Sequence, residues 1–278
     1  MTSRRGFSLA ELMVAMVIAG IIGAALARLV VNQARFVGTQ DAVMHARAGA
    51  RAALNVVTSE FRAVSDSGLV AASRDSVTIR VPYAFGIACA QVGGATIVSL
   101  LPAENSIYSA AVISGYAWRN PVTGAYSFVQ PTTVSSSTLT PCADSSITTL
   151  AVAGWTARAV SVAPNVLATP TGAPVYLYQL VRYAFAHSPE LPGRLALWRT
   201  VLSTGVREEL VAPFDTSAAF QFLVGYTLAV QTSAPADLNT VKGIRVRLVT
   251  ASETPPEGRT VPLKFDLSTN LLFRNNAQ

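Results

Sequence analysis

The chain has 278 residues, of which 51% are hydrophobic and 13% are charged, and its net charge is +6. This charged fraction is about half of the ~25% typical of soluble domains, which excludes an intrinsically disordered chain. The basic residues are scattered, with no block of five like charges, so a nucleic-acid binder is not predicted. The length fits one large domain or two small ones.

The most apolar part of the chain is its N-terminal segment. Arg4 and Arg5 precede Gly6, and no charged residue occurs in 12–27. Residues 7–31 form a stretch of 25 residues, long enough at ~1.5 Å per residue to cross a hydrocarbon layer of ~30 Å. The sequence therefore predicts a transmembrane helix over 7–31.

Two simple interpretations of this segment are a cleaved signal peptide and an ordinary signal anchor. The apolar run is longer than the usual signal core of roughly 7–15 residues, and only residues 23–25 offer a weak cleavage site. An ordinary anchor leaves Glu11 unexplained, because a carboxylate inside a membrane helix costs ~2.5–3.5 kcal/mol or more. Glu11 therefore indicates a functional site that needs a partner.

The run Gly6-Phe7-Ser8-Leu9-Ala10-Glu11-Leu12, placed between a short basic leader and a long apolar helix, resembles the type IV prepilins. The resemblance implies that a prepilin peptidase removes residues 1–6, cleaves between Gly6 and Phe7, and methylates the new N-terminus of Phe7. Glu11 would then be the acidic fifth residue of the mature chain. During assembly it could pair with the N-terminal amine of a neighbouring subunit, which would offset the desolvation cost of both charges.

Charge alone does not fix the orientation of this segment in the membrane. Arg4 and Arg5 favour a cytoplasmic N-terminus, but four arginines also follow the apolar run, namely Arg28, Arg35, Arg47 and Arg51. The resemblance implies a single pass through the inner membrane with a periplasmic globular domain. It also implies later incorporation into a pilus or pseudopilus at the cell surface.

The helical pattern continues beyond the transmembrane stretch, over 32–67. Residues 32–64 contain no proline, and apolar side chains recur every three or four positions. These side chains are Val43, Ala46, Ala50, Leu54, Val57, Phe61 and Val64. The pattern predicts an amphipathic helix that packs on a sheet, with Gly68 as a left-handed helix end.

Residues 68–278 are predicted to form a β-rich globular domain. Ser76–Val81 alternates as a strand that ends at Pro82, and 95–101 resembles a buried strand. Residues 102–174 are rich in Ala, Ser, Thr, Val and Pro, which predicts a loop-rich insertion with a few short strands. Further strands are predicted over 175–186, 194–201, 206–211, 218–232, 243–251 and 261–267. Together these elements predict an α+β, pilin-like fold, in which the long N-terminal helix packs on an antiparallel meander.

Several segments resemble the PilW-like minor pilins and the J-type pseudopilins of type II secretion. They include Leu197-Trp198-Arg199, residues 241–249, and residues 59–64 at the helix end. This resemblance implies a subunit without catalytic activity or cofactor, placed in a filament tip or initiation complex. Its expected partners are other minor pilins, major pilins, the prepilin peptidase and the inner-membrane assembly platform. A retractile pilus, a secretion pseudopilus and a DNA-uptake pilus all remain open.

The sequence carries no motif for an enzyme or a metal site. Nucleophile elbow, Walker, Rossmann and zincin motifs are missing. His45 and His187 lie far apart, and the neighbours Glu208 and Glu209 should face opposite sides of a strand. A secreted enzyme is therefore the weakest alternative, and it would require a pocket with converging titratable groups.

Cys89 and Cys142 are the only cysteines. A periplasmic domain permits a disulfide between them, which would stabilise the fold by ~4 kcal/mol in the chain-entropy model. The alternative is two separate buried thiols.

A pilus-tip adhesin or ligand-binding module is the second functional alternative, with the loop-rich insertion as the recognition surface. An exposed cluster of Tyr108, Tyr116, Trp118 and Tyr126 would support it, and a buried cluster would not.

Overall fold

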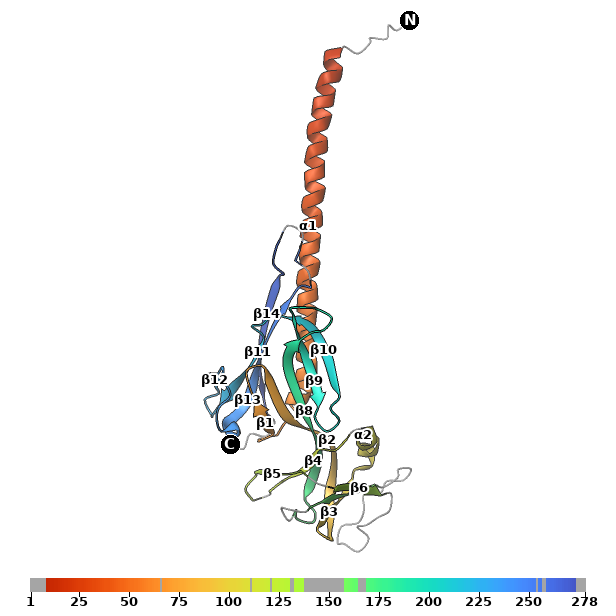
Figure 1. The fold of residues 1–278 in the computed structure, drawn as a ribbon, viewed down its shortest axis with the longest axis vertical. Coiled ribbons are helices and arrows are strands. Elements are labelled where there is room, and N and C mark those ends of the chain that lie inside the picture. The colour runs from red at the N-terminus through yellow and green to blue at the C-terminus, as the bar shows by residue number, and fades with distance from the viewer. Residues whose placement is uncertain are drawn as a thin grey trace.

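The computed structural model describes residues 9–65, 67–110, 112–120, 122–130, 133–137, 158–164, 169–253, 255–256 and 259–273. A single long helix, α1 (Leu9–Phe61), dominates the shape of the molecule (Figure 1). Its first half projects away from the rest of the chain, and its second half lies on a large antiparallel sheet. The predicted α+β, pilin-like architecture is thereby confirmed.

The described strands all belong to one sheet. They are β1 (Leu69–Ala72), β2 (Ser76–Val92), β3 (Ala95–Leu100), β4 (Gly115–Arg119), β5 (Tyr126–Val129), β6 (Thr133–Ser137), β7 (Ala159–Ala163), β8 (Pro174–His187), β9 (Leu195–Val201), β10 (Arg207–Phe214), β11 (Ala219–Val224), β12 (Ala229–Gln231), β13 (Val241–Ala251) and β14 (Lys264–Leu272). Short helical elements are η1 (Pro102–Glu104), α2 (Asn105–Ala110) and η2 (Leu238–Thr240).

The strand order is β12-β11-β13-β10-β9-β8-β2-β3-β7-β6, and all the pairings are antiparallel. Strands β8, β9 and β10 follow one another as a meander. Strand β13 departs from chain order, because one of its edges pairs with β11 and, at Thr250, with β10. Its other edge pairs with β14 from Gly243 to Ala251. Strand β13 therefore joins the C-terminal strands to the meander.

The long strands β2 and β8 run through two lobes with separate cores. They pair continuously, apart from one irregularity, from Ser76 opposite Ala184 to Ile87 opposite Pro174. We call the described part of residues 82–178 the distal lobe, because it lies at the end furthest from the N-terminus of α1 (Figure 1). The remainder of the globular domain is the helix-proximal lobe, whose core lies between α1 and the sheet.

The predicted apolar face of the helix is confirmed in the second half of α1. Its fully buried side chains are Ala46, Ala50, Ala53, Val57 and Phe61, while Val43 and Leu54 are half-buried. The alanines place little side-chain volume between the helix backbone and the sheet. Phe61 ends the stripe, with its ring centroid 5.4 Å from that of Tyr183 and 6.4 Å from that of Phe220.

The residue after α1 that adopts a left-handed conformation is Ser67, with φ of 60°, and not Gly68 as predicted. Gly68 is required for a different reason. A Cβ atom there would collide with the Val64 side chain and the Ser65 backbone. The turn after the helix is therefore so tight that only a residue without a side chain fits at position 68.

Two of the predicted strand boundaries are wrong. Strand β2 does not end at Pro82 but continues to Val92, because a register shift between Pro82 and Ala84 accommodates the proline as a bulge. The long strand predicted over 218–232 is instead a hairpin of β11 and β12. Its turn contains Gly225 and Leu228, which have φ of 67° and 54°.

The described part of the predicted insertion contributes ordered strands to the sheet. The hairpin of β4 and β5 pairs with β8, and β7 and β6 extend the sheet beyond β3. A second hydrophobic cluster lies beneath them and includes Val98, Tyr116, Trp118 and Leu177. Residues 138–157 lie outside the described part of the chain.

An ion pair connects the end of β10 to the start of β14. Lys264 Nζ lies 2.6 Å from Asp215 Oδ2, and the Asp215 side chain is only 14% exposed. Burial alone raises the pKa of Asp215, but Lys264 and the hydroxyl and amide of Ser217 outweigh it and hold the pKa at about 2, below the ordinary 3.8. The folded state is therefore stabilised above the unfolded-state pKa, and this contribution is lost as the pH falls toward 2.

Replacing Asp215 by Asn should remove this pH dependence. Near pH 6 we expect D215N to lower the free energy of unfolding by about 2 kcal/mol relative to the native chain. The difference should shrink steadily between pH 4 and pH 2, because the native carboxylate becomes protonated in that window. Urea unfolding of the detergent-solubilised chain at each pH measures it, and a difference that stays constant down to pH 2 would contradict the assignment.

Candidate functional site

The first half of α1 is apolar and has no cover from the rest of the chain. Every residue from Leu9 to Gly38 is exposed. Within the described residues, α1 is the one helix long and apolar enough to cross a membrane. Exposing this surface to water costs roughly 25 cal/mol per Å² of apolar area. This half of the helix therefore requires a bilayer or the apolar helices of other subunits around it.

Glu11 lies in the first turn of α1 and is exposed there among apolar side chains. A carboxylate in this position is favoured by the partial positive charge at a helix N-terminus. Gly6 and Phe7, the predicted cleavage and methylation residues, lie outside the described residues. The pairing of Glu11 with the N-terminus of another subunit stays a prediction.

The helix enters the domain at Ala46. The Thr250 hydroxyl on β13 donates a hydrogen bond of 2.8 Å to the Ala46 carbonyl oxygen. Beside it, the guanidinium carbon of Arg47 lies 5.4 Å from the centroid of the Phe265 ring on β14. These contacts hold the helix at the point where its exposed half begins.

A polar cluster, which we call the helix lock, fixes the other end of α1. Glu60 accepts hydrogen bonds on Oε1 from Nε and Nη2 of Arg199, at 3.0 and 2.8 Å. Its Oε2 accepts a bond of 2.7 Å from the Tyr183 hydroxyl. The ion-paired side chains of Glu60 and Arg199 are each 21% exposed. The helix lock thus joins the last turn of α1 to β8 and β9.

The protonation states of the helix lock suit this arrangement. Burial raises the pKa of the Tyr183 hydroxyl, and the charge of Glu60 and its hydrogen bond raise it further. Burial alone lowers the pKa of Arg199, but hydrogen bonding and charge from Glu60 outweigh it, so its pKa is raised. Tyr183 therefore remains a donor, and Arg199 remains a cation.

The sequence indicates this cluster only in part. Residues 59–64 and 197–199 resemble minor pilins and pseudopilins, but this resemblance assigns them no role, and no local pattern marks Tyr183. The alternation of β9 is the local signal for it, because Arg199 shares a face with Leu195 and Leu197, which both pack in the core. A charged residue on an inward face predicts a buried partner.

The disulfide prediction concerns one described cysteine and one that is not described. Cys89 is fully buried on β2 and takes part in a disulfide. Cys142 lies outside the described residues, so the structure does not describe the pairing, and the Cys89–Cys142 bridge remains a prediction.

The aromatic cluster named for an adhesin is not an exposed platform. Tyr116 is fully buried, and Trp118 is 6% exposed. Tyr108 and Tyr126 are half-buried. This cluster therefore serves the core of the distal lobe and gives no support to an adhesin.

The described residues contain no cluster of side chains that could hold a metal ion. No group of three His, Cys, Asp or Glu side chains comes together there. His45 and His187 are exposed on separate elements. Glu208 lies opposite Arg199 and Glu209 opposite Trp198, so the two carboxylates face opposite sides of the sheet, as predicted.

Replacing Glu60 by Gln should weaken the helix lock. We expect E60Q to lower the free energy of unfolding by about 2 kcal/mol, because the half-buried Arg199 loses its counter-charge. In a double-mutant cycle with R199Q, the two effects should be clearly non-additive. Urea unfolding in detergent measures both.

A matched control is the exposed pair of Arg247 and Asp266, whose closest atoms are 2.6 Å apart and whose side chains are 43% and 47% exposed. D266N should cost less than about 1 kcal/mol, because exposed ion pairs are weak. Equal losses for E60Q and D266N would show that the helix lock does not stabilise the docking of α1.

One family model matches the chain, the Prokaryotic N-terminal methylation motif, over residues 1–27. No curated protein and no solved structure matches. Residues 1–27 therefore carry a type IV pilin-type prepilin signal, which supports a pilin-like or pseudopilin precursor. Proteins with this motif are structural subunits that are processed by prepilin peptidase and assemble with other pilins.

Proposed function

We propose that this chain is a minor pilin or pseudopilin of the PilW/J type, incorporated at the tip or in the initiation complex of a filament. One observation carries the proposal. The methylation motif leads directly into a helix whose apolar first half is bare and whose second half is fixed in a β-rich domain. A subunit that is first in a membrane and then in a filament needs an exposed apolar segment for both surroundings and a second segment that anchors it to the domain.

The proposed organisation assigns each segment one step. Residues 1–6 are the leader removed by the peptidase, and 7–31 hold the subunit in the inner membrane with its domain in the periplasm. The segment 32–67 carries the helix into the domain as far as Phe61, and 68–278 form the domain itself. On assembly, the Phe7 amine of one subunit and Glu11 of another form an ion pair that offsets the cost of burying either charge alone.

The helix lock supports a mechanical role. Glu60 and Thr250 hold α1 at both ends of its docked half, at contacts of 2.7–3.0 Å. Because the helix is continuous from Leu9 to Phe61, this docking also sets the direction in which the bare half points. The helix and the domain then move as one rigid body, so a force on the exposed half of α1 is transmitted to the domain.

The distal lobe supports a position at the tip. It extends the domain at the end furthest from the N-terminus of α1 (Figure 1). Within the filament shaft, another subunit would have to pack against this end of the domain and leave room for the distal lobe. At the tip, no subunit covers this end. The same steric argument applies to retractile pili, secretion pseudopili and DNA-uptake pili.

Processing is tested by the N-terminal mass of the chain recovered from membranes. We expect a chain that begins with N-methylated Phe7, and G6A should block its formation, because the peptidase cleaves after Gly6. An intact Met1 in cells with active prepilin peptidase, or a start after Ala25, would contradict the proposal.

Assembly is tested by E11A in a chain that is still processed. We expect loss of the subunit from sheared filaments of at least tenfold, with normal amounts in the membrane, measured by immunoblot. The control is E208A, which removes an exposed carboxylate from β10. Normal incorporation of E11A would refute the role of Glu11.

A further inference from the structure

Strand β14 has one free edge. Its inner edge pairs with β13 along the whole strand, and no described strand pairs with its other edge. At the two ends of this pairing, the Phe273 amide donates to the Lys242 carbonyl, and the Ser252 amide donates to the Leu263 carbonyl. Hydrogen-bonded residues alternate along an antiparallel pair, so the odd-numbered residues of β14 bond to β13. The even-numbered residues therefore direct their amides and carbonyls to the free edge.

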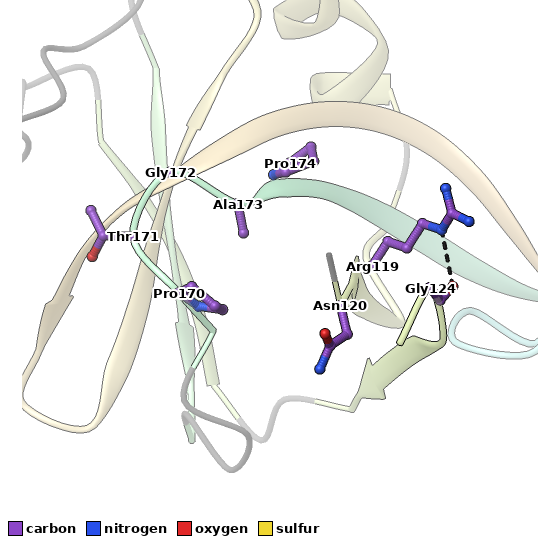
Figure 2. Close-up of a pocket in the computed structure, with 8 residues that line it drawn as sticks. All are labelled: Arg119, Asn120, Gly124, Pro170, Thr171, Gly172, Ala173 and Pro174. Carbon is purple, nitrogen blue, oxygen red and sulfur yellow. Dashed lines mark hydrogen bonds between the residues drawn. The ribbon is translucent and has the colours of Figure 1, made fainter. Parts of the chain in front are cut away.

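Five exposed residues of β14 share this outward orientation, namely Lys264, Asp266, Ser268, Asn270 and Leu272. Their backbone groups have no hydrogen-bond partner among the described residues. An edge of this length is a template for another strand, and folded proteins usually shorten, cover or distort such edges. The free edge of β14 is long and has no register shift, as a surface that pairs with another chain requires. The half-open pocket of the distal lobe in Figure 2 offers no comparable feature, because its Arg119 side chain points away from the Pro170–Pro174 wall.

Helix α1 runs alongside β14 (Figure 1). Arg47 stacks on the Phe265 ring near the start of the strand. Near its other end, Arg62 shares a cleft of about 580 Å³ with Asn270 and Leu272. These two contacts are ~22 Å apart along the helix, at ~1.5 Å per residue, and ~17–23 Å apart along the strand, at ~3.3 Å per residue. The helix and the strand therefore match in direction and in length.

Three exposed arginines, which we call the basic flank, lie on the side of α1 next to this edge. Arg47, Arg51 and Arg62 share one side of the helix, because their spacings of 4 and 11 residues are close to one and three turns. The other side of α1 faces β10, where a Cβ atom on Gly49 would lie 3.7 Å from Val211.

The positive charge of the basic flank is not neutralised within the described part of the chain. The ion pairs there join Glu60 to Arg199, Asp266 to Arg247 and Asp215 to Lys264, and none of them includes an arginine of the flank. Like charges four residues apart on a helix also repel each other, as Arg47 and Arg51 do. The flank therefore favours a partner with carboxylates.

We infer that the free edge of β14 and the basic flank together bind an acidic β-strand of a neighbouring filament subunit. The free edge selects an extended polypeptide, whose amides and carbonyls pair with those of β14. On the face next to α1, alternate side chains of the added strand lie ~6.7 Å apart, and Arg47 and Arg51 are ~6 Å apart along the helix. Glutamates or aspartates at alternate positions therefore meet the arginines in charge-assisted hydrogen bonds.

The partner is a different subunit and not a second copy of this chain. No described strand with a free edge carries acidic residues at alternate positions. Strands β1, β5, β6 and β12 contain none, β14 contains only Asp266, and the neighbours Glu208 and Glu209 of β10 face opposite sides of the sheet. The inference rests on the proposed filament function, because that function places other subunits beside this one.

The probe is a fluorescent nine-residue peptide that alternates glutamate and valine. It is titrated into the full processed chain in phosphatidylcholine nanodiscs, whose lipid has no net charge, and binding is followed by fluorescence anisotropy. We expect saturable binding that weakens as salt rises, because salt screens exposed charges. Binding should be at least tenfold weaker for a peptide with lysine in place of glutamate. It should be equally weak for an acidic peptide with prolines in place of two valines, which cannot pair as a strand.

Two variants test the free edge and the basic flank separately. S268P removes an outward amide and leaves the bonds to β13 in place, so it should weaken binding at least tenfold, whereas S268A should bind normally. R51E should also weaken binding at least tenfold. Its matched control is R207E, the same charge change at an exposed residue of β10, which should bind normally. Urea unfolding checks that S268P is folded, and R51E does not alter the strand.

Hydrogen exchange at single-residue resolution gives the signature of an added strand. On peptide binding, the outward amides of Asp266, Ser268 and Asn270 should exchange at least tenfold more slowly, whereas those of Leu267 and Thr269, already bonded to β13, should not change. Failure of the native chain to bind, equal binding of the proline peptide, or unchanged binding by S268P or R51E would overturn the inference. The N-terminal mass and the E11A experiment test the filament function without this edge, so the two failures are distinguishable.

Discussion

The docking of one continuous helix on one sheet is the constraint on which the rest of the structure depends. An α-helix that runs unbroken for 53 residues behaves as a rod, so whatever fixes its second half also fixes the direction of its first. The alanine stripe brings the rod close to the sheet, and Phe61 fills the core at its end. The apolar half that projects beyond Ala46 is then presented to its surroundings at a defined angle.

Charge is used at the margins of this core and not within it. The helix lock and the Asp215–Lys264 pair both lie where part of each side chain still reaches solvent. In such positions the two charges attract each other more strongly than in an exposed ion pair, and their desolvation costs less than that of a fully buried pair. The two pairs act at complementary places, since one ties α1 to β8 and β9 and the other ties β10 to β14.

The distal lobe depends on the long strands β2 and β8. Because these strands contribute to both cores, the two lobes share a backbone framework while each packs its own apolar residues. Tyr116 and Trp118 belong to the second core. The sheet is therefore the connection between the two lobes.

The sequence by itself determined those features of the protein that short-range patterns encode. The motif around Gly6, Phe7 and Glu11, the long apolar run and the three-to-four spacing of the amphipathic half need only local spacing to be recognised. Only the tertiary structure decided which distant segments meet. Glu60 reaches Tyr183 and Arg199 across 123 and 139 residues. Strand β13 pairs on one edge with β11 and β10, which precede it in the chain, and on the other edge with β14, which follows it. Local patterns also gave the wrong strand boundaries at two places. At Pro82 a bulge lets β2 continue where a proline predicts its end, and at Gly225 a tight turn divides one predicted strand into two. Pairing across a sheet is a property of the whole fold, and no local pattern encodes it.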